Sequence, residues 1–244
     1  TMKPLDLLTI QSGGILTKAG NTGISGGVLS YPGGGTPLII HAVGLASDNT
    51  TITSLLQGGN GQGNGNISFI KTGNGILTLQ PGASAIAGVG GNVAGGQTEI
   101  NQGALKLDGG NNTLYFNNFL SLIGGTLDLN GNAQTSRLFD GGSTFNGGGT
   151  ITGIAGSTFV ENLDGANRNF SGTITGAVAF QKTGANNTLS MFSDSTTTGD
   201  ILIAAGTTQM RDSARFSGTL NLDINYGVLT LDNNVGTINE NDRI

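Results

Sequence analysis

Paired acidic side chains are the groups of this 244-residue chain that could do acid–base chemistry. Asp108 and Asp128 are separated by about one expected turn of a coiled chain, so their carboxylates could lie one above the other. Carboxylates about 5 to 9 Å apart are what glycoside hydrolysis requires. However, Asp108 begins a Gly-Asn corner, where aspartate is a common turn residue, and Asp128 falls in a polar column of a strand pattern. Asp223 and Asp232 lie near the far end of the chain. We therefore expect no catalytic residue.

The only histidine, His41, lies in the strand-like run of residues 38–42. Alternation places it on one face of a strand, so we expect a solvated or hydrogen-bonded residue there, and no Ser-His-Asp grouping. Residues 58–66 resemble a glycine-rich calcium loop, but they carry Asn and Gln where such loops need Asp. The chain has no cysteine. We expect no metal and no cofactor.

The composition excludes several other classes of protein. The chain has 45 glycines, 10% charged residues and a net charge of -5. Its lysines and arginines are scattered singly, so we expect no nucleic-acid partner. No segment approaches the roughly 18 apolar residues that a membrane-spanning helix needs, so we expect no membrane insertion by this segment. Glycine interrupts nearly every amphipathic window, which argues against helices.

Short runs of alternating residues predict strands with one buried face. The clearest runs are 76–79, 104–107, 126–129 and 228–231. We predict a structural core made of the leucines that share one phase of the alternation, which are Leu77, Leu79, Leu105, Leu107, Leu127, Leu129, Leu229 and Leu231. We expect the residues between them to face outward, and these are Thr78, Lys106, Asp128 and Thr230.

A unit that occurs twice predicts how the strands are arranged. It reads F-I-K-T-G-N-G-I-L-T-L from Phe69 and F-Q-K-T-G-A-N-N-T-L-S from Phe180. Self-similarity on this scale is typical of stacked units. Strands arriving roughly every eight to twelve residues, broad Gly/Asn corners in place of two-residue hairpin turns and few aromatic residues favour a solenoid over a sandwich. We predict a single continuous parallel β-helix over 1–244, with repeat copies near 69–132 and 170–234 and about eleven or twelve rungs.

The repeated segments resemble the autotransporter-associated β-strand repeat of bacterial surface and secreted proteins. That pattern runs F-S-G-x-I-S-G, then L-x-K-x-G-x-G-x-L-x-L, then G-G-T-x-I-x-x-G-x-L-x-L, and residues 170–184, 69–79 and 95–107 are similar to it. Residues 124–134 are similar to the leucine rung that often follows. The second copy departs from the pattern at Asn186 and Asn187, where glycine is usual, and at 208–210, where a leucine pair is usual.

The resemblance implies a right-handed parallel β-helix that a bacterium displays or secretes through an outer-membrane route. On this basis we expect a non-enzymatic extracellular stalk or adhesin segment of an autotransporter-like protein. Its expected partners are glycans or proteins of a host or neighbouring cell surface. Two alternatives stay open: a structural subunit that self-associates along the coil axis into an extracellular fibre or sheath, and a polysaccharide lyase or hydrolase of the β-helix type. Both ends are patterned as rungs, so we expect a fragment of a longer protein.

Overall fold

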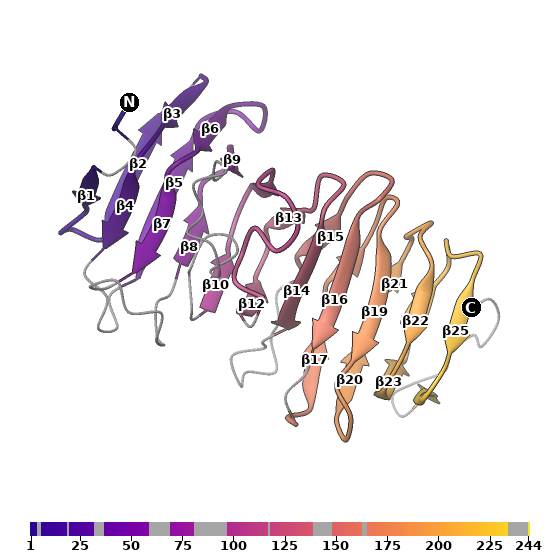
Figure 1. The fold of residues 1–244 in the computed structure, drawn as a ribbon. Helices are drawn as coiled ribbons and strands as arrows, with labels where there is room; N and C mark the ends of the chain where they lie inside the picture. The colour runs from indigo at the N-terminus through magenta and orange to yellow at the C-terminus, as the bar shows by residue number, and fades with distance from the viewer. Residues whose placement is uncertain are drawn as a thin grey trace.

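The chain folds as a β-solenoid, in which successive turns place their strands side by side along one axis (Figure 1). The computed structural model describes residues 1–3, 6–18, 20–31, 37–58, 69–80, 97–116, 118–138, 148–162, 165–233 and 244. Within these ranges the regular secondary structure is all strand. Every strand pair there is parallel, as the parallel β-helix prediction requires.

The strands form two long sheets and three shorter ones. The ten-stranded sheet contains β2 (Gly14–Lys18), β5 (Leu38–Val43), β8 (Phe69–Thr72), β10 (Gln97–Ile100), β12 (Phe119–Leu122), β14 (Ala133–Leu138), β16 (Thr158–Asn162), β19 (Ala179–Thr183), β22 (Ile201–Ile203) and β25 (Leu222–Ile224). The seven-stranded sheet contains β3 (Thr22–Ile24), β6 (Asn49–Ile52), β9 (Ile76–Leu79), β11 (Ala104–Leu107), β13 (Thr126–Asp128), β15 (Thr150–Thr152) and β18 (Thr173–Ile174).

Shorter sheets complete the turns. A four-stranded sheet contains β17 (Arg168–Phe170), β20 (Thr188–Met191), β23 (Gly206–Arg211) and β26 (Gly227–Asp232). A three-stranded sheet contains β1 (Leu7–Thr9), β4 (Val28–Tyr31) and β7 (Leu55–Gly58), and a two-stranded sheet contains β21 (Asp194–Ser195) and β24 (Arg215–Phe216).

The strand register shows that the turns differ in length. In the C-terminal part of the chain, Phe180 pairs with Ile201 and Ile201 pairs with Leu222, so these two turns are short and equal. Earlier in the chain Leu38 pairs with Phe69, and this turn takes up a clearly longer stretch of sequence. Because the early turns are longer, the longest sheet has ten strands, and the prediction of eleven or twelve rungs was too high.

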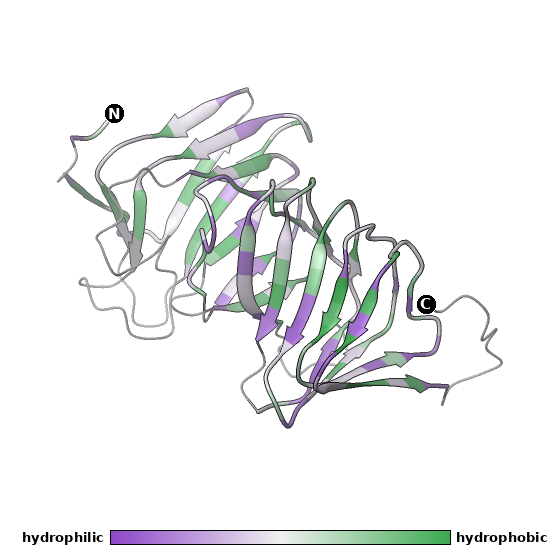
Figure 2. Ribbon diagram, turned by 45° about the vertical axis from the view of Figure 1, so that its right-hand side comes forward, coloured by the Kyte–Doolittle hydropathy of each residue, from purple (hydrophilic) through white to green (hydrophobic). Residues whose placement is uncertain are grey.

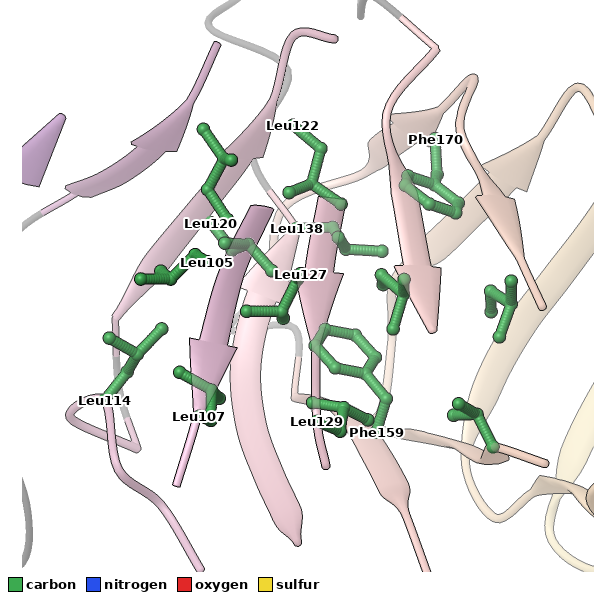
Figure 3. Close-up of a cluster of buried hydrophobic side chains, with 14 of the residues drawn as sticks. Leu105, Leu107, Leu114, Leu120, Leu122, Leu127, Leu129, Leu138, Phe159 and Phe170 are labelled. Carbon is green, nitrogen blue, oxygen red and sulfur yellow. The ribbon is translucent and has the colours of Figure 1, made fainter. Parts of the chain in front are cut away.

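Apolar side chains form a buried cluster inside the coil. Figure 2 shows apolar and polar residues following one another along the strands. Leu105 pairs with Leu77 on one neighbouring strand and with Leu127 on the other, so one residue type stacks over several turns. Figure 3 shows the side chains around this column, including Leu105, Leu127 and Phe159, gathered between the sheets. Burying a leucine or phenylalanine contributes about 1.5 to 3 kcal/mol each, so this column is a main source of stability.

Six of the eight leucines assigned to the core are fully or almost fully buried, and these are Leu77, Leu79, Leu105, Leu107, Leu127 and Leu129. The other two differ. Leu229 is only partly buried, and Leu231 is 47% exposed. Both lie on β26, whose partner among the described strands is β23 on one side alone. Because no described strand follows β26, the alternation of β26 gives its leucines less to pack against.

The residues between the leucines face away from this column, with different exposure. Lys106, Asp128 and Thr230 are half-buried. Thr78 is buried, and its hydroxyl donates a 2.8 Å hydrogen bond to Asn49 Oδ1 on the neighbouring strand. Outward threonines of this kind therefore stack against side chains of the previous turn.

Candidate functional site

The repeated F-x-K-T-G unit buries its lysine. Lys71 and Lys182 are both 0% exposed. In β8 and β19 the lysine follows an inward phenylalanine by two residues, so the period of two turns it to the same inner face. Sequence reasoning missed these lysines, although the phase of the alternation in F-x-K was a signal that could have found them.

Lys71 joins two successive corners of the coil. Its Nζ donates hydrogen bonds to the carbonyl oxygens of Thr72 (2.9 Å), Gly73 (2.7 Å) and, on the next turn, Gln102 (2.9 Å). An ammonium group has three protons, and each finds one carbonyl here. Gly73 has a φ of +79° and lies so close to the Ala42 carbonyl that a Cβ would clash with it. We call this arrangement the lysine clamp.

Lys182 repeats the lysine clamp in the second copy. Its Nζ donates to the carbonyl oxygens of Thr183 (2.6 Å), Gly184 (3.0 Å) and, on the next turn, Ala205 (3.2 Å). A fourth contact, to Asn187 Oδ1 at 2.8 Å, has no counterpart at Lys71. Both clamps satisfy carbonyl groups at tight corners, which would be costly to bury without partners.

Burial sets the electrostatics of the two clamps. Removal from water lowers the pKa of Lys71 to about 8. It lowers the pKa of Lys182 too, while the negative charge of Glu161 acts in the opposite direction. Carbonyl oxygens favour the charged form of an amine that donates to them, and a pKa of about 8 leaves Lys71 mainly as an ammonium group at neutral pH. Elsewhere in the core, burial raises the pKa of the Tyr31 hydroxyl.

The candidate carboxylates take part in corner hydrogen bonds. Asp108 Oδ1 accepts from the side-chain amide of Asn130 at 2.8 Å, and Asp128 Oδ1 accepts from the backbone N–H of Asn130 at 2.9 Å. The structure therefore brings these two aspartates to one asparagine, whose φ is +50°. Asp223 lies on β25, whereas Asp232 lies on β26 and forms an ion pair with Arg211 at 3.4 Å.

The remaining sequence candidates are His41 and the glycine-rich loop. His41 is exposed on β5, and its Nδ1 is hydrogen-bonded to the hydroxyl of Thr72 on β8. Most of the glycine-rich loop, residues 59–66, lies outside the described residues. Across the described ranges, no three His, Asp or Glu side chains gather in a group that could hold a metal ion. The same ranges contain no helix of the length and apolar character needed to cross a membrane.

Two grooves lie near the C-terminal turns. One, of about 620 Å³, is lined by side chains that include Asn167, Asn186, Thr188, Thr207 and Tyr226. Tyr226 is 86% exposed, so its ring presents an apolar face beside amide and hydroxyl groups. The second groove, of about 720 Å³, is lined in part by Gln181, Asp200, Leu220, Asn221 and Asp223. An aromatic ring beside neutral hydrogen-bonding groups is chemically suited to a sugar ring, which has both apolar and hydroxyl faces.

The resemblance of the repeated unit to the autotransporter-associated repeat stays a prediction from the sequence. Comparisons with protein-family models, with curated proteins and with solved structures find no match.

Proposed function

We propose that this chain is a non-enzymatic extracellular β-helical segment, a stalk or adhesive shaft of a bacterial surface or autotransporter-like protein. One observation carries the proposal: parallel strand ladders continue from turn to turn, over a stacked apolar column and between lysine clamps at two corners. Such a structure supplies length and stiffness, because each turn contacts chiefly its neighbours.

The mechanical role is tested on the purified chain. In dilute solution, small-angle X-ray scattering should give the profile of a rod with a constant cross-section along its length. At about 4.8 Å per stacked strand, ten strands correspond to a length on the order of 45 Å. A compact, isotropic particle would contradict the proposal.

An adhesive contact is proposed at the groove around Tyr226. Support comes from the exposed ring and from the neutral amide and hydroxyl groups that line the groove. Binding of the chain to an array of bacterial and host glycans should show at least one ligand that the Tyr226→Ala variant loses. Phe116→Ala is the matched control, because Phe116 is also an exposed aromatic residue and does not line this groove. Equal loss in both variants would place the contact elsewhere.

The enzymatic alternative makes a separate prediction. Because Asp108 and Asp128 already serve one corner asparagine, we propose that they stabilise a turn. Incubation with pectin, alginate and related polymers should therefore yield neither new reducing ends nor unsaturated products. Activity that is lost in Asp108→Ala or Asp128→Ala would overturn the non-enzymatic proposal.

A second candidate function is assembly end to end into a fibre or sheath. The observation that favours it is apolar exposure on the outermost described strands, at Leu7 and Leu8 of β1 and at Val228 and Leu231 of β26. Open strand edges with apolar side chains favour pairing with another chain. Electron microscopy over a range of concentrations decides: filaments that lengthen with concentration support assembly, and short rods of one length exclude it.

A further inference from the structure

The two lysine clamps differ in the residue that precedes each lysine by one turn. Ile40 pairs with Lys71, whereas Glu161 pairs with Lys182. Glu161 is fully buried, and its Oε2 accepts a 2.8 Å hydrogen bond from the backbone N–H of Leu138. The second clamp therefore has a buried carboxylate at a position where the first has an aliphatic side chain.

The clamps also differ in the residue that immediately precedes the next strand. Gly75 stands before β9 in the first copy, and Asn187 stands before β20 in the second. Asn187 is buried, and its carboxamide oxygen lies 2.8 Å from Lys182 Nζ. Because three carbonyl oxygens already satisfy the equivalent Lys71 ammonium, the carboxamide is an acceptor beyond what the clamp needs.

An amine, a carboxamide and a carboxylate buried together are the groups that an intramolecular amide exchange requires. We propose that Lys182 and Asn187 become joined by an isopeptide bond, which the folded chain forms by itself with Glu161 as the proton acceptor. Lys71, which has neither the carboxamide nor the carboxylate beside it, forms no such bond and stays in its hydrogen-bonded clamp.

The reaction balances without any further reagent. The Lys182 ammonium gives one proton to the Glu161 carboxylate, and the resulting amine attacks Cγ of Asn187 to form a new C–N bond. The bond between Cγ and the original amide nitrogen then breaks. That nitrogen takes up the protons released from Lys182, including the one held by Glu161, and leaves as ammonium. Glu161 ends as it began, and no atom is oxidised or reduced.

The folded chain removes two usual obstacles to this reaction. Lys182 and Asn187 flank one short corner that holds them in contact, so little entropy is lost in bringing them together. Burial excludes bulk water from both side chains, which limits competing hydrolysis, and it favours the neutral amine that attacks. The product would staple the end of β19 covalently to the start of β20, where the lysine clamp holds the corner non-covalently.

Mass spectrometry of the denatured wild-type chain tests the proposal whether or not any variant folds. We expect an intact mass lower than the sequence mass by one ammonia. Trypsin should fail to cleave after Lys182 and should release residues 169–211 as one peptide, in place of 169–182 and 183–211. Cleavage after Lys71 should be complete, which provides a control within the same molecule. A chain of full sequence mass with complete cleavage after Lys182 would overturn the proposal and leave an ammonium clamp alone.

Two variants separate the roles of the partners. Asn187→Gly copies the first repeat, and it should restore both the sequence mass and cleavage after Lys182. Glu161→Gln keeps the size of the side chain but cannot take the proton, so it should also restore both readouts while retaining the wild-type circular dichroism spectrum. In the wild type, loss of ammonia with complete cleavage after Lys182 would indicate a succinimide and contradict the cross-link. A Glu161→Gln protein that still forms the cross-link would contradict the role of Glu161 as proton acceptor.

Discussion

The lysine clamp at Lys71 predicts an unusual dependence of stability on pH. Its ammonium is fully buried with carbonyl partners, and burial lowers its pKa to about 8. The same side chain in the unfolded chain has a pKa near 10.4. Between these two values the unfolded chain binds more protons than the folded chain, so the free energy of unfolding rises as pH increases through this window.

The size of this effect follows from the two pKa values. Each pKa unit corresponds to about 1.4 kcal/mol, so the full shift stabilises the folded chain by at most about 3 kcal/mol between pH 8 and pH 10.4. This figure already contains the hydrogen bond that is lost on deprotonation, because a neutral amine has two protons for three carbonyl oxygens.

The perturbation is Lys71→Met, which keeps an unbranched side chain and removes the titrating group. Free energies of unfolding from urea titrations, followed by far-UV circular dichroism, are compared for the two proteins from pH 7 to pH 10. The absolute cost of the substitution combines lost hydrogen bonds with relief of a buried charge. The informative quantity is therefore how the difference in unfolding free energy between wild type and Lys71→Met changes with pH. All groups other than residue 71 are the same in both proteins, so their contributions to the pH dependence largely cancel.

We expect the stability advantage of the wild type over Lys71→Met to be constant below about pH 7 and to grow as the solution is made more alkaline. Lys106→Met is the control, because Lys106 faces outward on β11 and makes no clamp, and it should follow the wild type across the range. A difference between wild type and Lys71→Met that stays flat from pH 7 to pH 10 would refute the burial argument.

Two further substitutions test the packing. Leu105→Asp places a carboxylate inside the leucine column and should lower the free energy of unfolding by several kcal/mol. Leu231→Asp changes a side chain that is 47% exposed and should lower the free energy of unfolding far less. Equal shifts in melting temperature for the two variants would contradict the inward assignment of Leu105. Gly103→Ala adds a Cβ that clashes with the carbonyl of Gly73 and should be much more destabilising in urea titrations than Gly110→Ala. Gly110 also has a positive φ but has open space around it, so only backbone strain of about 1 to 2 kcal/mol is expected there.

The strand pattern was readable in β11 and at β13 because buried leucines alternate there with half-buried charged residues. Leu105 and Leu107 flank a lysine, and Leu127 and Leu129 flank an aspartate, so period-two reasoning assigns the inner face directly. The same reasoning fails at Leu231 because burial there depends on a following turn, and alternation within one strand contains no information about neighbours.

The number of turns could not be read from the sequence for a related reason. Strands are recognisable by their alternation, but the length of chain between paired strands is set by the corners. The long stretch from Leu38 to Phe69 and the shorter one from Phe180 to Ile201 both close one turn of the coil. A uniform repeat length therefore overestimates the count wherever corners are long.

The lysine clamps were missed because a charged residue is ordinarily assigned to the surface. The corners reverse this expectation. At Lys71 the chain turns through Gly73 and leaves backbone carbonyls pointing inward, where water cannot reach them. A long side chain that ends in three donors satisfies them from within.

Buried polar groups also explain how the coil chooses its register. Gln134 is fully buried and exchanges hydrogen bonds with the backbone of Leu114 on an adjoining segment, and the side chain of Asn118 pairs with both the N–H and the hydroxyl of Thr98. Leucines tolerate sliding past one another by two residues, since the same face stays buried, but a lysine or amide moved in this way would lose its partners at a cost of about 1 to 3 kcal/mol for each group. Apolar alternation therefore specifies which face is inside, and the polar residues within the core specify the register between neighbouring turns.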